Sequence, residues 1–443
     1  MNYDCIVIGS GAAGLTVSFG LKAAGKKVLL IEKDEPGGEC TWNGCIPSKS
    51  FISYSKKETN LKIALEKVRE KILEVAKTED PDIIVKKGID YIKGKAIFVS
   101  KTEVDVAGKV YKGKNIVIAT GSRPFIPKIK GLEKVEFLTN ENFFKQTVNF
   151  KSIIMIGGGV ISLELSFALK RLGVDVTILE LGKKFLPIED PEIGEFYKKR
   201  LIQEGIKLVL DCGEIKIEKI NDMVVTKCPK DEYQAEKLFL SVGRVPNLEG
   251  LNLEKIGVDF DKKGILANEY LQTTVKEIYA VGDVVGPYRF SHIAGYQGET
   301  VVRNIIFPYI KKKIDYQNIS WTTFSDPEFA RVGINEEEAK SKGLDIRVYT
   351  LLENENDRSV VSLEKKFYLK VICDKKFNIL GASCIGERAG EIINIIQILK
   401  SQNIKFYKMV NSIQAYPTYG DSVRKLAKKA YGDYLRKIFS FKL

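Results

Sequence analysis

The chain has 443 residues, of which 44% are hydrophobic and 29% charged. This length and balance exclude a disordered or fibrous protein and predict roughly three compact units. The formal net charge is +13, but lysine is scattered over most segments, so we expect a generally basic surface that attracts anionic cofactors, and no nucleic-acid partner. No apolar run approaches the ~20 residues of a membrane span. The chain begins directly with a strand pattern, and its seven cysteines are an odd, mostly scattered set, so we expect a cytoplasmic protein.

The first element is a short apolar strand over residues 3–8, followed by a glycine-rich turn, a helical stretch and a second strand over 27–31 that ends in Glu32. Glycines in such a turn let backbone N–H groups approach a pyrophosphate at the positive end of a helix, and the acidic residue is placed to hold a ribose hydroxyl. The sequence therefore predicts a dinucleotide-binding unit. Its turn glycines are Gly9, Gly11 and Gly14.

Two cysteines, Cys40 and Cys45, follow this unit with four residues between them, among them the flexible step Asn43-Gly44. Such a pair forms a disulfide if the backbone brings its Cα atoms within about 7 Å. The alternative is half of a structural zinc site, but the usual short spacing and a second pair of ligands are missing, and no metal site is predicted. In a reducing compartment a nearby pair favours redox chemistry.

The strand, turn, helix and strand pattern recurs further along the chain. A strand over 152–156 leads into a second glycine-rich turn, and a strand over 174–179 ends in Glu180. The acidic residue follows the first glycine at the same distance in both copies. Glu180 would bind a free 2′-hydroxyl and repel a 2′-phosphate, which favours NADH, although Lys183 and Lys184 leave NADPH as an alternative. The small residues of this turn are Gly157, Gly159 and Ser162.

Three further segments complete the pattern, namely 119–124 (Ala-Thr-Gly-Ser-Arg-Pro), 241–247 (Ser-Val-Gly-Arg-Val-Pro-Asn) and 278–283 (Ile-Tyr-Ala-Val-Gly-Asp). With the two glycine units and the cysteine pair, the chain resembles the pyridine nucleotide-disulfide oxidoreductases, the flavoprotein family of dihydrolipoamide dehydrogenase, glutathione reductase and mercuric reductase. The resemblance runs over essentially the whole length.

The resemblance implies that the first unit binds FAD and the second the nicotinamide nucleotide, with Asp283 reaching the flavin's ribityl chain. Lys49 would be a flavin neighbour paired with Glu164, and His292 would lie at a helix start beside the flavin. Hydride would pass from NADH to the flavin, and electrons then to Cys45 and the outward Cys40. Positive charge and a helix start near the pair are expected to lower a thiol pKa. Further implied cofactor residues are Thr120, Gly121 and Gly243.

The implied fold is α/β, with two Rossmann-type dinucleotide-binding domains and a C-terminal α+β dimerisation domain. The FAD domain would comprise 1–149 and 275–317, with the NAD(P) domain, 150–274, inserted in it. The dimerisation domain would comprise 318–443. The family's active site is completed by the partner's tail, so the resemblance implies a homodimer.

One segment departs from the family. Where disulfide reductases carry a His-Pro-Thr-x-x-Glu acid/base pair, this chain has Tyr416-Pro417-Thr418-Tyr419-Gly420-Asp421. A phenol with an unperturbed pKa near ~10 is a poor proton shuttle at neutral pH, and Asp421 has no imidazole to orient. The acceptor therefore stays open between a disulfide or other small molecule and, as in mercuric reductases, a metal ion bound by thiolates. A flavin redox sensor or electron-transfer partner is the non-enzymatic alternative.

The end of the chain, from Val423 to Phe441, combines apolar residues at helical spacing with lysines and arginines. One interpretation is a basic amphipathic helix that makes weak peripheral contact with the inner face of the membrane, where it would deliver electrons to quinone. The other is a tail packed at the dimer interface.

Overall fold

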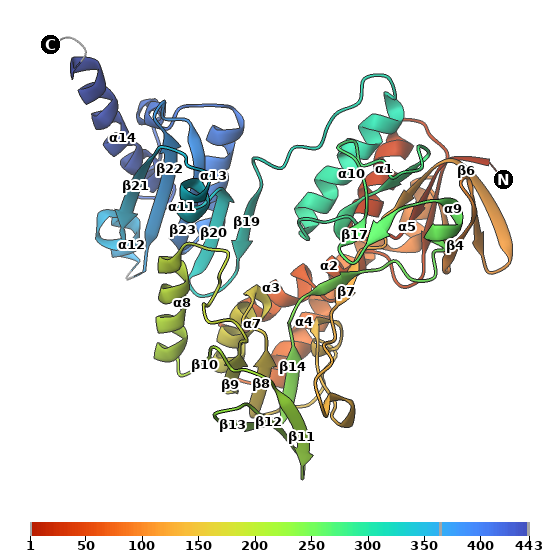
Figure 1. Cartoon of the computed structure of the whole chain (residues 1–443), viewed down its shortest axis with the longest axis horizontal. Coiled ribbons are helices and arrows are strands. Elements are labelled where there is room, and N and C mark those ends of the chain that lie inside the picture. Colours follow the sequence, from red (N-terminus) through yellow and green to blue (C-terminus); the bar gives the residue numbers. More distant parts are fainter. Residues whose placement is uncertain (1, 363–365, 441–443) are drawn as a thin grey trace. The chain divides into compact units, whose positions relative to one another are not determined.

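The computed structural model describes residues 2–362 and 366–440, which form two compact units (Figure 1). Unit 1 contains the described residues up to Gly158, together with Ala168–Leu181 and Asp211–Ile314. Unit 2 contains Gly159–Phe167, Gly182–Leu210 and the described residues from Asp315 onward. The predicted three-domain boundaries stay a prediction.

The main layer of unit 1 is a seven-stranded sheet in the order β3-β2-β1-β6-β5-β4, with β18 also paired to β6. The β1, β2, β3, β6 and β18 strands run parallel to one another. The β5 strand pairs antiparallel with β6, and β4 pairs antiparallel with β5. The strands are β1 (Asn2–Ile8), β2 (Val28–Glu32), β3 (Asp90–Lys93), β4 (Ala96–Ser100), β5 (Glu103–Val106), β6 (Lys109–Ile118) and β18 (Ile278–Ala280).

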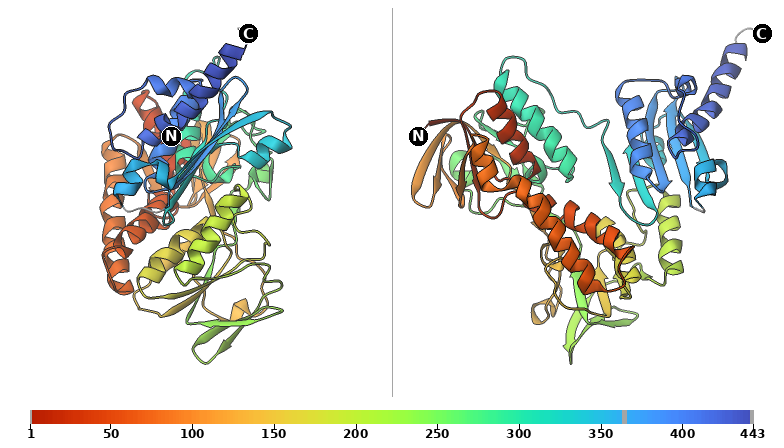
Figure 2. Two further views of the ribbon diagram at one scale, coloured as in Figure 1. Left: turned by 90° about the vertical axis from the view of Figure 1, so that its left-hand side faces the viewer. Right: turned by 180° about the vertical axis from the view of Figure 1, so that it is seen from behind.

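Both faces of this sheet are buried, because residues 5–8 of β1 and 28–31 of β2 form unbroken apolar runs. In β1 the side chains of Ile6 and Ile8 enter one core and those of Cys5 and Val7 the other. The α1 and α10 helices pack side by side over the second face (Figure 2). The helices of unit 1 outside the second glycine unit are α1 (Ala12–Ala23), α2 (Gly38–Trp42), α3 (Cys45–Ser55), α4 (Leu61–Ala76), α5 (Pro81–Lys86), α6 (Asn140–Phe143), α9 (Leu253–Ile256) and α10 (Ser291–Ile306).

The second nucleotide unit carries a smaller parallel sheet in which β8 lies between β9 and β14. The antiparallel strands β11, β12 and β13 form a three-stranded sheet, and β7 pairs with β15. The elements are β7 (Ser122–Pro124), β8 (Ser152–Ile156), α7 (Val160–Arg171), β9 (Asp175–Leu179), β11 (Lys216–Ile220), β12 (Met223–Lys227), β13 (Glu232–Ala235), β14 (Lys237–Leu240), β15 (Arg244–Pro246), β16 (Phe260–Asp261) and β17 (Gly264–Ile265).

Unit 2 is built on a five-stranded antiparallel sheet in the order β19-β20-β23-β22-β21. The α13 helix packs on β20 and β23, and α13, α14 and the sheet share one hydrophobic core. The elements of this unit are α8 (Pro191–Gln203), β10 (Lys207–Val209), β19 (Ser320–Thr323), β20 (Glu328–Gly333), α11 (Glu336–Ser341), β21 (Ile346–Leu352), α12 (Asp357–Val361), β22 (Tyr368–Asp374), β23 (Ile379–Gly386), α13 (Ala389–Ser401) and α14 (Asp421–Ser440).

The apolar stripe at the end of the chain belongs to α14, whose first half is buried inside unit 2. Val423, Leu426, Ala427 and Ala430 are fully buried in the core against the sheet. The later turns extend beyond the sheet (Figure 2), and Tyr434 still packs against the edge of the core. Phe441, the last residue of the predicted stripe, lies outside the described residues. Packing within the chain thus accounts for the first half of the stripe, and membrane contact stays a prediction.

Within residues 2–362 and 366–440, no helix combines the length and the apolar character needed to cross a membrane.

Candidate functional site

At Gly9 and Gly14 the first glycine turn is packed so closely that a side chain would not fit. Gly9 has φ +102°, and a Cβ there would lie 2.4 Å from the Ala119 carbonyl oxygen. A Cβ at Gly14 would lie 1.8 Å from the Gly9 oxygen. Gly11 is the N-cap residue of α1, and no side chain caps this end of the helix. The turn thus leaves a helix N-terminus and backbone N–H groups in the form that binds a pyrophosphate.

Glu32 is fixed at the end of β2 beside this turn. Its carboxylate accepts hydrogen bonds from the Ser10 backbone N–H at 2.7 Å and the Ser10 hydroxyl at 2.8 Å. It also accepts one from the Asp34 N–H at 2.9 Å. The acid predicted to hold a ribose is therefore oriented by the turn that would hold the phosphates.

The second glycine turn repeats this geometry. Gly157 has φ +103°, and a Cβ there would lie 2.5 Å from the Ser241 carbonyl oxygen. The Gly158 N–H donates to the Glu180 carboxylate at 2.6 Å, as Ser10 does to Glu32. Ser162 is completely buried, as expected of a small residue that replaces the motif's last glycine. Gly159 lies in open space, with no atom near a hypothetical Cβ. Both turns fit a dinucleotide.

The predicted residues near the end of β6 and β18 are linked to each other in unit 1. The Thr120 hydroxyl donates to the Asn247 carbonyl at 2.8 Å, and the Asn247 side chain donates back to the Thr120 carbonyl at 2.9 Å. Asp283 accepts from the Ser122 hydroxyl at 2.7 Å. These bonds hold the strand ends where the resemblance places the flavin.

Two other glycines of these segments adopt left-handed backbone conformations. Gly121 has φ +69° and Gly243 has φ +130°. Residues with a Cβ are strained at such angles, which explains glycine at both places.

The structure brings Cys40 and Cys45 into side-chain contact. Cys40 lies in α2 and Cys45 is the first residue of α3, where the helix dipole stabilises negative charge. The Cys45 sulfur lies 3.4 Å from the Ser291 hydroxyl at the start of α10. A Cβ at Gly38 would lie 2.6 Å from the Gly11 Cα, so the thiol segment packs directly on the first glycine turn.

The expected lowering of a thiol pKa is not found at Cys40. Its hydrogen bond with Cys45, followed by burial, raises the pKa of Cys40. The Ser291 hydroxyl acts in the opposite direction and lowers the pKa of Cys40. Two thiols that share one site resist double ionisation. The pair therefore favours a state in which one sulfur is a thiolate and the other, still protonated, donates a hydrogen bond to it.

Glu39 and Trp42 anchor the thiol segment. The Glu39 carboxylate is paired with Arg244 and accepts a hydrogen bond from the Asn140 side chain. The Trp42 indole N–H donates to the Pro36 carbonyl at 2.7 Å. Burial raises the pKa of Glu39, although Arg244 opposes this. Sequence reasoning missed these partners, and its only signal for Arg244 was membership of the segment 241–247.

Further along this segment, the Thr41 hydroxyl donates to Glu79 at 2.8 Å. Each residue from Glu39 to Trp42, apart from Cys40 itself, thus holds the segment through its side chain.

The remaining predicted residues near the thiols lie on separate elements. Lys49 lies on α3 in unit 1, whereas Glu164 is buried in unit 2 and accepts a hydrogen bond from the Phe324 N–H at 2.9 Å. Their pairing stays a prediction. His292 is the second residue of α10, is exposed, and stacks on Phe290 with ring centroids 5.5 Å apart.

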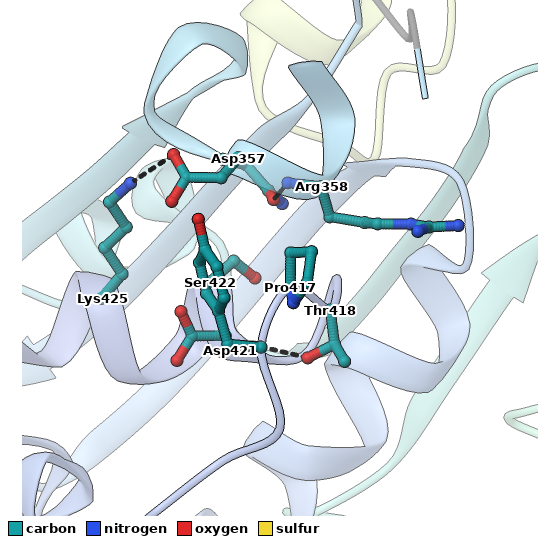
Figure 3. Close-up of a pocket in the computed structure, with 9 residues that line it drawn as sticks. Asp357, Arg358, Pro417, Thr418, Asp421, Ser422 and Lys425 are labelled. Carbon is teal, nitrogen blue, oxygen red and sulfur yellow. Dashed lines mark hydrogen bonds and ion pairs between the residues drawn. The ribbon is translucent and has the colours of Figure 1, made fainter. Parts of the chain in front are cut away.

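Tyr416 and Asp421 line one small pocket of unit 2, shown in Figure 3. Tyr416 is 70% exposed and precedes a cis proline. Asp421 begins α14, and its N–H donates to the Thr418 hydroxyl at 3.3 Å. The opposite wall contains Asp357, which is ion-paired with Lys425 at 3.2 Å. The pocket thus presents a phenol and two carboxylates.

Two dinucleotide-binding turns in one chain, with a contacting thiol pair packed on the first, define a nucleotide-dependent thiol oxidoreductase. Residues 3–298 match the family model "pyridine nucleotide-disulphide oxidoreductase", and residues 319–427 match the dimerisation domain of that family. The chain belongs to the pyridine nucleotide-disulphide oxidoreductase family.

Relatives of known name cover nearly the whole chain. A mercuric reductase from Lysinibacillus sphaericus is 30% identical over 96% of this chain and 82% of its own length. A dihydrolipoyl dehydrogenase from Bacillus subtilis (strain 168) is 30% identical over 97% of this chain and 96% of its own. Among solved structures, the Cu(II) complex of the HOCl-induced flavoprotein disulfide reductase RclA from Escherichia coli has a TM-score of 0.90, with 26% identity over 97% of this chain and 99% of that chain.

Family membership confirms the predicted fold class, the oxidoreductase activity and the use of FAD and NAD(P)H. The match to the dimerisation domain supports the predicted homodimer.

Proposed function

We propose that this protein is an NADH-dependent flavoprotein reductase whose redox centre is the Cys40–Cys45 pair. The observation that carries the proposal is the contact between the two thiols, with Cys45 at the start of α3 and Ser291 beside it. A dithiol with one thiol favoured as thiolate can be oxidised to a disulfide and reduced again without moving the backbone far. Cys40 would act as the outward thiol when the pair has been reduced to the dithiol.

The first glycine turn with Glu32 would hold FAD, and the second with Glu180 would hold NADH. When bound, FAD accepts hydride from the nicotinamide and supplies electrons in a form that a disulfide can take up. The protein's part is to orient both nucleotides through Glu32 and Glu180, whose carboxylates are held by the N–H groups of Ser10 and Gly158. Thr120, Gly121, Asp283 and His292 would complete the flavin site, and Gly243 the nicotinamide site.

We further propose the domain assignment that the family pattern implies. The FAD domain would comprise 1–149 and 275–317, the NAD(P) domain 150–274 and the dimerisation domain 318–443. The Tyr416 pocket would then face the thiol pair of the partner subunit in a homodimer. A cytoplasmic location fits a working thiol pair.

The acceptor is proposed to be a low-molecular-weight disulfide or other small molecule that needs little help from a protein base. Tyr416 supports this, because an exposed phenol cannot relay protons to a thiol efficiently at neutral pH. Reduction of a soft metal ion is the second candidate. It is favoured by the same tyrosine, since thiolates bind such ions without a base, and by the likeness to mercuric reductases and to a reductase solved with Cu(II).

The test is anaerobic titration of the holoenzyme with NADH, followed by a panel of lipoamide, glutathione disulfide, polysulfide, quinones, Hg(II) and Cu(II). We expect NADH to generate two new titratable thiols per chain, both at positions 40 and 45. The proposal fails if no new thiol appears while NADH is consumed. Slow turnover with every acceptor, despite full reduction by NADH, would instead favour a redox sensor.

A further inference from the structure

A second pair of cysteines meets in unit 1, away from the Cys40–Cys45 pair. Cys212 lies beside Glu180, the residue that follows β9, and Cys228 directly follows β12. The two thiols lie close enough that each affects the ionisation of the other, and the Cys212 sulfur lies 3.9 Å from the Gly213 carbonyl oxygen. Fifteen residues separate the two cysteines in the sequence, and this spacing matches no short cysteine motif.

The backbone geometry of the β11–β12 hairpin explains the contact. Antiparallel pairing sets Lys216 opposite Lys227 at the open end of the hairpin. The two chain ends therefore leave the hairpin side by side. A Cβ at Gly213 would lie 2.8 Å from Cγ of Pro229, so the residues next to the two cysteines are in direct contact.

Cys212 sits in a turn that fixes its direction. The preceding Asp211 has φ +54° and the following Gly213 has φ +69°. Cys212 is 5% exposed, whereas Cys228 is half-buried. Cys228 is therefore the thiol that a small molecule can reach, and Cys212 is placed behind it.

The pair is connected to the proposed nicotinamide site through one residue. The Cys212 N–H donates to the Glu180 carbonyl at 3.1 Å. The Glu180 carboxylate in turn accepts the bond from Gly158 in the glycine turn. A movement of Cys212 toward Cys228 would thus pull on the backbone of the acid that is proposed to bind the ribose.

A metal site is not supported at this place. In the described part of the chain, no group of three or more histidine, cysteine or acidic side chains is placed to hold a metal ion. The charged neighbour of the pair, Asp231, is bound to the Tyr233 hydroxyl at 3.1 Å. Two contacting thiols without further ligands are suited to disulfide formation.

We propose that Cys212 and Cys228 form a second reversible disulfide, closed by low-molecular-weight disulfides, whose formation weakens nicotinamide-nucleotide binding at Glu180. The Cys228 thiolate attacks the small disulfide, RSSR, and releases one RSH after proton uptake. The Cys212 thiol then attacks the Cys228 sulfur of the mixed disulfide and releases the second RSH. Two protein thiols thus lose two electrons and two protons, and RSSR gains them.

The thiols' surroundings set the conditions of this reaction. Burial raises the pKa of Cys212 to about 11, and burial also raises the pKa of Cys228, which the hydrogen bond from Cys212 partly offsets. Because the thiolate is the nucleophile, closure should be slow at neutral pH and accelerate as the pH rises. The pair therefore responds to prolonged exposure to oxidised small thiols.

The experiment uses the full-length holoenzyme, incubated with glutathione disulfide at pH 7 and pH 9, blocked with iodoacetamide and mapped by peptide mass spectrometry. We expect a peptide pair linked through positions 212 and 228 and lighter by the two lost hydrogens. We expect faster closure at pH 9. The absence of this linked pair after prolonged exposure would overturn the proposal.

The effect on the nucleotide rests on the proposed function of Glu180 and is measured separately as the NAD+ dissociation constant. Oxidation of the wild type should raise it about fivefold or more, and dithiothreitol should restore it. Cys228→Ser should not respond to glutathione disulfide, and Cys373→Ala, which removes a buried thiol of unit 2, should respond as the wild type does. A linked pair without any change in NAD+ binding would overturn the coupling. Failure of the reduced wild type to bind NAD+ would instead contradict the proposed nucleotide site.

Discussion

The thiol segment around Cys40 and the turn around Tyr416 are the two parts of the proposed reaction centre, and they are built in opposite ways. Around Cys40 the neighbouring side chains are bound to partners from distant parts of unit 1, such as Arg244 and Glu79. Tyr416 is 70% exposed at the edge of a small pocket. The electron-receiving side is therefore fixed before any substrate arrives, whereas the acceptor side is left open. Fixed geometry suits a reaction common to the family, and an open pocket suits an acceptor that varies.

The largest expected effect comes from Cys45→Ser. Loss of this sulfur removes the partner with which Cys40 is proposed to form the disulfide, so turnover with small disulfides should fall by at least about a thousandfold. Anaerobic oxidation of NADH by the holoenzyme should persist, because the nucleotide turns are untouched. Stopped-flow measurement of NADH consumption, with steady-state acceptor turnover beside it, separates the two steps.

Cys5→Ala is the matched control, because Cys5 is a fully buried thiol of β1 in the same unit, and its sulfur lies 3.7 Å from the Ile6 carbonyl oxygen. It should keep its acceptor turnover. Equal losses in both variants would mean that the thiol pair is not the redox centre.

The second effect tests the acceptor side. Tyr416→His restores an imidazole next to Asp421 and should raise kcat/KM for lipoamide about a hundredfold, the lower end of what a general acid–base contributes. Tyr416→Phe should change it less than about threefold, since the phenol is not expected to move protons. The pH profile of Tyr416→His should acquire a limb near the pKa of histidine, about 6.5. Rapid lipoamide turnover by the wild type would show that the missing histidine does not limit the enzyme.

The third effect tests how firmly the thiol segment is held. Arg244→Met removes the ion-pair partner of the half-buried Glu39 and should cost about 2 kcal/mol of unfolding free energy. Arg123→Met breaks the pair with the more exposed Glu249 and should cost less than about 1 kcal/mol. Urea unfolding of the two variants measures the difference.

The pH dependence of this loss has a definite sign. Burial raises the pKa of Glu39 above its unfolded value of 4.5, so the folded state binds this proton more tightly than the unfolded state. The corresponding stability is fully present below pH 4.5 and is lost as the pH rises through the folded-state pKa. Without Arg244 the folded protein stabilises the charged Glu39 carboxylate even less. The loss of unfolding free energy caused by Arg244→Met should therefore grow as the pH rises. A constant deficit would mean that Glu39 does not depend on Arg244.

The sequence predicted the local features of these sites and missed those that depend on tertiary contact. The glycine turns and the acids Glu32 and Glu180 follow from strict spacing, because one strand, one turn and one helix place them. The partnership of Glu39 with Arg244 joins residues that no sequence pattern relates. The same holds for Cys212 and Cys228, which the hairpin brings together.

The apolar stripe of α14 shows the converse limit. Its periodicity correctly predicts an amphipathic helix, but periodicity cannot say what covers the apolar face. Val423 and Leu426 are buried by the sheet of unit 2 itself, a fact that only the folded chain supplies.

The smallest expected effect concerns Ser291, whose hydroxyl lies 3.4 Å from the Cys45 sulfur. The Ser291 hydroxyl lowers the pKa of Cys40, so Ser291→Ala should raise that pKa further. Alkylation of Cys40 by iodoacetamide in the NADH-reduced enzyme should then slow about threefold at pH 8, with its pH profile displaced to higher pH.

Ser48→Ala provides the comparison on the helix that Cys45 begins. Its hydroxyl donates to the Gly44 carbonyl at 2.7 Å, so its loss removes a backbone contact near the thiols and leaves the Ser291 contact in place. Its alkylation profile should match that of the wild type. If the pH profile of Cys40 alkylation in Ser291→Ala also matches that of the wild type, the ionisation of the thiol pair does not depend on the Ser291 hydroxyl. A displaced profile would extend the fixed side of the centre from the thiol segment to the start of α10.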